Sequence, residues 1–153
     1  ALEGAVAAGA VSAEAAGRYH VLDYLTQMEQ AYACADGVIC RSGAGTVAEL
    51  TALGLPALYV PLPVGNGEQR LNAADVIAAG GGRLVPDAEL NVAQVRAFTQ
   101  VLTDPQAHEA MAQAAASTGV RDGAARLADL VRQVAGTGDR VAGSEEKSDD
   151  DAA

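Results

Sequence analysis

The residues best suited to chemistry lie in a glycine-rich segment, residues 41–45 (RSGAG), and in the stretch that follows it. The segment comes after a short apolar run at 37–40 and before an apolar pattern of helical spacing, which predicts a turn between a strand and a helix. Thr46 and Glu49 have the spacing of a capping box, which predicts that the helix begins near Thr46. A helix start at such a turn offers unpaired N–H groups and a partial positive charge. The leading interpretation is therefore a site for an anionic nucleotide diphosphate.

The elements that would position this turn alternate between strand and helix along the chain. Strands are expected at 18–24, 37–40, 57–60 and 83–85, and helices at 25–35, 46–53, 68–79, 92–102, 105–116 and 123–134. Gly54 and Pro56 would end the helix after the turn, and Asn91 and Asp104 are suitable N-caps for later helices. The run at 37–40 does not alternate, which is typical of a strand buried on both faces. The alternation of elements predicts an α/β fold with a parallel sheet and right-handed crossovers.

Length and charge narrow the class of protein. The chain has 153 residues, enough for one domain with a hydrophobic core but few for two. Its formal net charge of −10 argues against nonspecific binding to nucleic acid or to an anionic membrane surface, so no nucleic-acid partner is expected. No apolar run reaches about 18 residues, so no membrane-spanning helix is expected.

The cysteines and histidines indicate neither a disulfide framework nor a metal site. Cys34 and Cys40 lie in apolar surroundings and are expected to be reduced thiols. His20 and His108 are far apart and belong to no recognisable ligand cluster. The first residues lack a starting Met and a basic segment, so we expect no signal peptide and interpret the sequence as joined partway through.

Two regions are expected. Residues 1–135 are expected to form a partial α/β domain, and residues 136–153 a disordered acidic tail. The tail holds six acidic and two basic residues and has no apolar period. That composition is typical of a segment that cannot bury enough apolar surface to fold.

Several motifs at fixed spacing resemble the MurG family of N-acetylglucosaminyltransferases, which form lipid II in peptidoglycan synthesis. The motifs are RSGAGTVAEL at 41–50, GLPA at 54–57, VP at 60–61 and GEQRLNA at 67–73, and the likeness extends from about Tyr19 to Val134. The family has two Rossmann-like domains that face each other across a cleft, an architecture called GT-B. The resemblance implies that this chain is most of the C-terminal, donor-binding domain. It also implies a cytoplasmic protein, peripheral on the cytoplasmic face of the cell membrane.

The resemblance gives roles to three groups of residues. In the family the matching turn binds the diphosphate and the sugar, a matching carboxylate bonds the ribose hydroxyls, and matching side chains lie near the GlcNAc hydroxyls. The turn residues are Gly43, Ala44, Gly45, Thr46, Val47 and Ala48, the carboxylate is Glu49, and the side chains near the sugar are Glu68, Gln69 and Asn72. Some members have two glutamines where this chain has Glu68 and Gln69, which leaves open which of the two contacts the sugar. No catalytic residue can be assigned within this chain.

The implied reaction is an inverting transfer of GlcNAc from UDP-GlcNAc to the C4 hydroxyl of undecaprenyl-pyrophosphoryl-MurNAc-pentapeptide. The resemblance implies that this lipid-linked acceptor binds through the family's N-terminal domain, and that this domain is missing from the sequence. No cofactor and no tightly held metal are expected, because the helix N-terminus would stabilise the leaving diphosphate. Two alternatives stay open: another GT-B UDP-sugar transferase with a different acceptor, and an inactive truncated α/β domain. Locally, Thr46 and Glu49 could form only a helix cap, and Arg41 fits a structural ion pair as well as a phosphate contact.

Overall fold

Three short strands form a parallel sheet with the order β1-β2-β3. The structure is a computed structural model that describes residues 2–138. The strands are β1 (Val38–Cys40), β2 (Ala57–Tyr59) and β3 (Gly82–Leu84). In the register, Leu58 of the central strand lies opposite Ile39 on one side and Arg83 on the other. The predicted α/β class with a parallel sheet is therefore confirmed.

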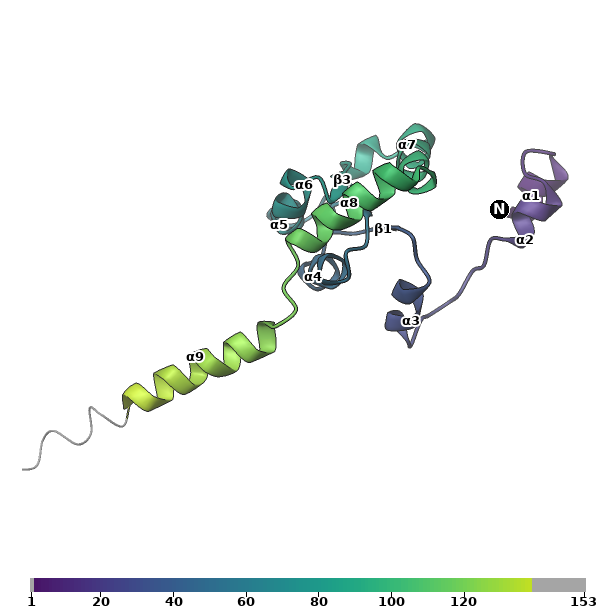
Figure 1. The fold of residues 1–153 in the computed structure, drawn as a ribbon. Helices are drawn as coiled ribbons and strands as arrows, with labels where there is room; N and C mark the ends of the chain where they lie inside the picture. Colours follow the sequence, from purple (N-terminus) through teal and green to yellow (C-terminus); the bar gives the residue numbers. More distant parts are fainter. Residues whose placement is uncertain (1, 139–153) are drawn as a thin grey trace, which may run out of the picture. The chain divides into compact units, whose positions relative to one another are not determined.

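Helices connect and cover these strands (Figure 1). They are α4 (Ala44–Leu53), α5 (Glu68–Asn72), α6 (Ala74–Ala78), the 3₁₀ helix η1 (Asp87–Glu89), α7 (Val92–Thr103) and α8 (Pro105–Ser117), and a further helix, α9 (Gly123–Gly138), comes after α8 without covering a strand. Gly54 ends α4 in the left-handed conformation, with φ 71°, as the sequence predicts. The Oδ1 of Asn91 accepts the N–H groups of Ala93 and Gln94, and Asp104 caps α8 in the same way.

The core lies where α7 and α8 pack against the sheet. Leu58, Val85 and Phe98 form a buried cluster, and Leu102 and Met111 pack against it. Helix α8 also lies alongside α4 and α7 (Figure 1). These contacts fix β2 at the centre of the sheet. The segments that follow β1, β2 and β3 therefore start from fixed positions.

Strand β1 differs from the prediction in its burial. The non-alternating run predicts burial on both faces, but Ile39 is 45% exposed. The reason is its place in the sheet, since β1 pairs only with β2 among the described residues and forms an edge. Burial on both faces is found in β2 instead, where all three residues are buried.

The single helix expected at 68–79 is two short helices. Helices α5 and α6 are separated at Ala73, which has φ −90° and ψ −4°. Just before this break, the side-chain amide of Asn72 donates a hydrogen bond of 3.1 Å to the carbonyl of Ser42. The end of α5 is thereby tied to the glycine-rich turn.

Residues 1–34 form a unit of their own, with helices α1 (Leu2–Ala7), α2 (Ala13–Gly17) and α3 (Met28–Ala33). The strand predicted at 18–24 is wrong, because this segment has no regular structure. Its large apolar side chains are all exposed: Tyr19, Val21, Leu22 and Tyr24. A strand needs a neighbour to bond its backbone, and no described residue pairs with this segment.

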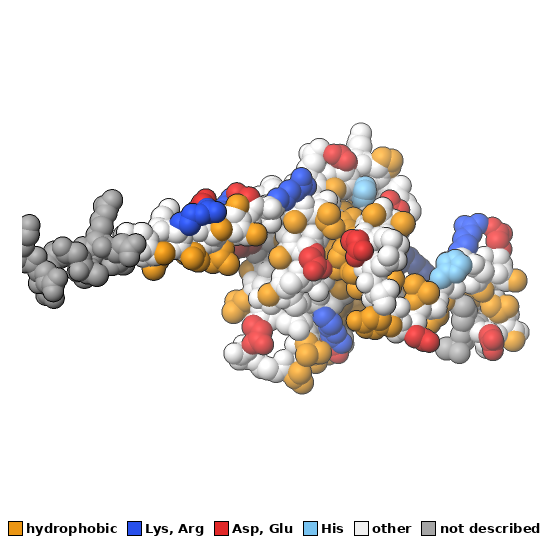
Figure 2. All heavy atoms as spheres, turned by 90° about the horizontal axis from the view of Figure 1, so that it is seen from below, with side chains coloured by type: hydrophobic (Ala, Val, Ile, Leu, Met, Phe, Trp, Pro, Cys, Tyr) orange, Lys and Arg blue, Asp and Glu red, His pale blue; other side chains and the backbone are white. Residues whose placement is uncertain are grey.

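The last described helix, α9, is amphipathic. Leu127, Leu130, Val131 and Val134 follow a spacing of three and four residues and are all exposed. Figure 2 shows hydrophobic side chains gathered along one side of this helix and charged side chains along another. The helix continues through residue 138, so residues 136–138 are helical where the tail was expected to begin. The rest of the predicted tail lies outside the described residues, and no described helix is long and apolar enough to cross a membrane.

The two thiols of the chain have different surroundings. Cys34 is exposed, whereas Cys40 is partly buried beside Tyr59. Burial raises the pKa of the Cys40 thiol from 9.0 to about 11. The pKa of Tyr59 is raised to about 12, chiefly by burial and further by Cys40.

We expect Cys40 to react with a disulfide reagent about tenfold more slowly at pH 8 than Cys34. Compared with a pKa of 9.0, a pKa near 11 lowers the thiolate fraction of Cys40 about 100-fold. The more basic thiolate is intrinsically more nucleophilic, which offsets part of that loss. The release of chromophore should be biphasic, and Cys34→Ser should remove the fast phase. Loss of the slow phase in Cys34→Ser instead would contradict this assignment.

Candidate functional site

The site begins where β1 passes through the glycine-rich turn into α4. Gly43 is the N-cap, with an extended conformation of φ −64° and ψ 147° and no side-chain cap. The N–H of Val47 makes the first helical bond, 3.0 Å to the Gly43 carbonyl. The N–H groups of Ala44, Gly45 and Thr46 therefore have no acceptor within the helix. They form a donor set suited to an anion.

The capping box predicted for Thr46 and Glu49 is wrong. Helix α4 starts at Ala44, so Thr46 is its third residue and cannot be its N-cap. Gly43 adopts the N-cap conformation without a side-chain acceptor, which leaves the first amides of the helix uncapped. The correction moves the helix start by two residues but keeps it within the segment predicted to bind a diphosphate.

The turn residues predicted to bind ligand divide into two groups in the structure. Ala44, Gly45 and Ala48 are exposed, Gly43 and Thr46 are half-buried, and Glu49 is exposed one turn into the helix. Val47 is buried, and its N–H is already bonded to Gly43. Its side chain therefore packs in the core, while Ala44, Gly45, Ala48 and Glu49 are open to solvent.

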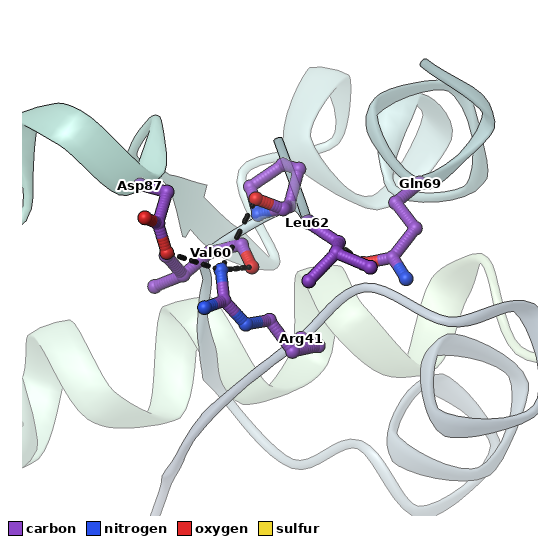
Figure 3. Close-up of polar contacts among 6 residues, drawn as sticks. Arg41, Val60, Leu62, Gln69 and Asp87 are labelled. Carbon is purple, nitrogen blue, oxygen red and sulfur yellow. Dashed lines mark hydrogen bonds and ion pairs between the residues drawn. The ribbon is translucent and has the colours of Figure 1, made fainter. Parts of the chain in front are cut away.

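Gln69 and Asn72 meet the same edge of the sheet from α5. The N–H of Leu62 donates to Gln69 Oε1 at 3.0 Å (Figure 3), and Asn72 Nδ2 donates to the Ser42 carbonyl at 3.1 Å. The backbone partners fix how both amides are turned, because an N–H can only donate and a carbonyl can only accept. The NH₂ group of Gln69 and the side-chain oxygen of Asn72 therefore remain available to bind a ligand.

Glu68 lies beside Gln69 but is placed differently. It is exposed at the first position of α5, and no hydrogen bond or ion pair to it is found within residues 2–138. Gln69 is half-buried and held by the loop that precedes it. The two adjacent candidates therefore differ in how they are held: the side chain of Gln69 is fixed by a hydrogen bond, and that of Glu68 is solvated.

Sequence reasoning missed one feature of the site, the partner of Arg41. Its Nη1 lies 2.5 Å from Asp87 Oδ1 and also donates to the carbonyls of Val60 and Pro61. The structural ion pair, one of the two interpretations left open, is therefore the one observed. No sequence signal points to Asp87, because only the order of the strands brings β1 and η1 together.

A cavity of about 220 Å³ borders the site without coinciding with it. Its walls include Ala44, Ala48 and Asn72, together with Thr118 and Val120 from the segment after α8. Glu49 and Gln69 do not line it. Some of the predicted residues thus line this cavity and others do not. The N–H groups without helical acceptors at the start of α4 belong to residues of both sets.

No metal site accompanies these residues in the part of the chain that the structure describes, where no three His, Cys, Asp or Glu side chains gather. The expectation that no resident metal is needed stays a prediction. The chemistry available at the site is hydrogen bonding to an anion by backbone amides and to a polar ligand by two fixed side-chain amides.

Comparison with known protein families matches residues 8–127 to the glycosyltransferase family 28 C-terminal domain. The matched region contains the whole glycine-rich turn, α4 and α5. This chain belongs to that family.

Two relatives of this family 28 domain share the name UDP-N-acetylglucosamine–N-acetylmuramyl-(pentapeptide) pyrophosphoryl-undecaprenol N-acetylglucosamine transferase. The protein of Clavibacter michiganensis is 58% identical over 116 residues, which cover 75% of this chain and 32% of the relative. That of Mycobacterium tuberculosis is 56% identical over 125 residues, which cover 80% of this chain and 30% of the relative. The chain spans about a third of the length of these relatives.

The fold of the family 28 domain is also found in a solved structure. The crystal structure of Acinetobacter baumannii MurG superposes with a TM-score of 0.68 at 28% sequence identity. The match covers 74% of this chain and 35% of that one. The resemblance to the MurG family and the Rossmann-like α/β arrangement, both expected from the motifs, are therefore confirmed.

Proposed function

We propose that this chain is the donor-binding part of a glycosyltransferase that transfers GlcNAc from UDP-GlcNAc to the C4 hydroxyl of undecaprenyl-pyrophosphoryl-MurNAc-pentapeptide. The observation that carries the proposal is the start of α4, where three amides without helical partners follow the C-terminal end of β1. In open α/β sheets, ligands bind outside the carboxyl ends of the strands. The choice of substrates is supported by the name that the relatives share.

In this proposal the diphosphate of UDP lies against the amides of Ala44, Gly45 and Thr46. The acceptor oxygen attacks the anomeric carbon from the side opposite UDP, and the bond to the UDP oxygen breaks with its electron pair leaving on the diphosphate. The acceptor proton passes to a base outside this chain, and the anomeric configuration inverts. The amides at the helix N-terminus stabilise the negative charge that grows on the leaving group.

The sugar and the ribose contact different side chains. Gln69 offers NH₂ hydrogens and Asn72 offers an amide oxygen, so together they can donate to one sugar hydroxyl and accept from another. We choose Gln69 over Glu68 as the sugar contact, because its amide is already held in one orientation. Glu49, one turn into α4, is assigned to the ribose hydroxyls, since a carboxylate can accept from both members of a vicinal diol.

The acceptor and the catalytic base belong to the part of the relatives' length that this chain does not match. We propose that the lipid-linked acceptor binds there, on the cytoplasmic face of the membrane, and that the 153-residue chain alone binds donor without turning it over. In this proposal, as in the GT-B architecture, one domain binds the donor, another binds the acceptor, and the reaction takes place in the cleft between them.

An NMR titration with UDP tests the donor site. We expect the backbone amide signals of Gly43, Ala44, Gly45 and Thr46 to move as UDP is added, because hydrogen bonds to phosphate oxygens deshield the N–H protons. UDP-GlcNAc should in addition move the side-chain NH₂ signals of Gln69. Unchanged signals at millimolar UDP, in a well-dispersed spectrum, would contradict the proposal.

Competition among nucleotide sugars separates the proposed substrate from the alternative within the same class. UDP-GlcNAc should displace a fluorescent UDP analogue at lower concentration than UDP-glucose or UDP-galactose. A preference for either of these sugars would favour another UDP-sugar transferase with a different acceptor.

A further inference from the structure

One side chain, Arg41, connects the ends of all three strands. It follows β1 directly, and its Nη1 donates to the carbonyl oxygens of Val60, at 3.2 Å, and Pro61, at 3.3 Å, just after β2. The same nitrogen forms the ion pair with Asp87, the first residue of η1 after β3. Figure 3 shows the guanidinium between these groups, with the carbonyl oxygens and the carboxylate turned toward it.

The segment held by Arg41 is the start of the loop that leads to α5. This loop is exposed from Leu62 to Gly67, and two of its glycines have positive φ, 95° at Gly65 and 81° at Gly67. Its first residues are fixed from two directions: Arg41 holds the Pro61 carbonyl, and Gln69 accepts the N–H of Leu62. A continuous set of contacts therefore runs from Arg41 through Pro61 and Leu62 to the amide of Gln69.

The ion pair itself adds little to stability. The side chains of Arg41 and Asp87 are 48% and 38% exposed, and solvent screens a pair of this kind. What the contacts do fix is position, because an arginine bound to two successive carbonyls and a carboxylate leaves the chain little freedom at that point. The effect of losing Arg41 should thus fall on loop geometry more than on folding.

We propose that Arg41 is a positioning residue for the sugar half of the site. It holds the start of the β2–α5 loop so that the Leu62 N–H keeps the oxygen of Gln69 and turns the NH₂ group toward the ligand. The proposal rests on the donor site proposed above. It adds that the diphosphate half and the sugar half of that site differ in whether they depend on Arg41. The diphosphate is bound by α4 amides that do not depend on Arg41, whereas recognition of the sugar does depend on it.

Two substitutions test this separation by their effect on the affinities for UDP and UDP-GlcNAc, measured by calorimetry on the whole chain. Arg41→Gln removes the guanidinium, and Asp87→Asn weakens its third contact while leaving Arg41 in place. In both variants the affinity for UDP should stay within about twofold of the wild type. The preference for UDP-GlcNAc over UDP should fall about five- to tenfold in Arg41→Gln and less in Asp87→Asn, as expected for one lost hydrogen bond.

Arg70 provides a matched control, because it is an exposed arginine next to Gln69 and has no ion pair among the described residues. Arg70→Gln removes the same charge and should leave the preference unchanged. The side-chain NH₂ signals of Gln69 give a second readout: they should move in Arg41→Gln without ligand and stay in place in Arg70→Gln.

The outcomes separate this inference from the proposed function. A wild-type chain that does not bind UDP would remove the proposed function itself. A wild-type chain that prefers UDP-GlcNAc, with the preference intact in Arg41→Gln, would overturn only the positioning role. Loss of UDP affinity in Arg41→Gln but not in Asp87→Asn would also overturn it, because Arg41 would then be a phosphate contact.

Discussion

Replacing Phe98 with alanine is expected to lower the free energy of unfolding by about 3–5 kcal/mol. Phe98 is the single phenylalanine of the chain and is 1% exposed. Its ring joins α7 to Leu58 and Val85, so the substitution leaves a cavity directly above the central strand. Because a domain of this size is stable by only about 5–15 kcal/mol, the loss is a large part of the total. Urea unfolding followed by circular dichroism measures it.

Val92 gives the matched control on the same helix. It is 74% exposed at the first position of α7, so Val92→Ala should change the free energy of unfolding by less than about 0.5 kcal/mol. Equal unfolding midpoints for the two variants would show that the Phe98 cluster is not the core. In Phe98→Ala the binding of UDP should weaken only in proportion to the unfolded fraction, since none of the residues proposed to bind the donor belongs to the Phe98 cluster.

The elements that the sequence predicts well are those set by local chemistry. Asn91, Asp104 and Gly54 begin or end their helices as expected, because a cap is decided by one side chain and its neighbours in sequence. The segment at 18–24 fails for the opposite reason. Its residues favour a strand, but a strand also needs a partner, and the sequence does not say whether one is present.

The local structure around the glycine-rich turn follows from the sequence in outline but not in detail. The sequence predicts the turn between β1 and α4 correctly, but the Thr46–Glu49 spacing places the helix start two residues too late, since Gly43 opens the helix without a side-chain cap. The position of Asn72 could be read from the motif, but not its bond to Ser42, nor the pair formed by Arg41 and Asp87. These contacts join segments far apart in sequence and exist only because β1, β2 and β3 lie side by side.

The start of α4 allows a substitution that removes one amide and keeps the helix. Ala44→Pro eliminates the N–H at the first helical position, where proline is favoured because that N–H has no helical acceptor. The preceding residue, Gly43, already has ψ 147°, which is the conformation that a following proline requires. Ala44 is exposed, so the ring enters solvent and not the core. The unfolding midpoint should therefore stay at or slightly above that of the wild type.

The same substitution should weaken the binding of UDP about 10- to 150-fold. A hydrogen bond to a charged group contributes about 1.5–3 kcal/mol, and each 1.4 kcal/mol corresponds to a factor of ten in affinity. Ala44→Ser is the control, because it changes the side chain and retains the N–H, and it should bind UDP nearly as well as the wild type. Calorimetry on the three proteins decides the matter. If Ala44→Pro is folded and binds UDP like Ala44→Ser, the amide of residue 44 does not face the diphosphate, and the anion site must be sought away from the start of α4.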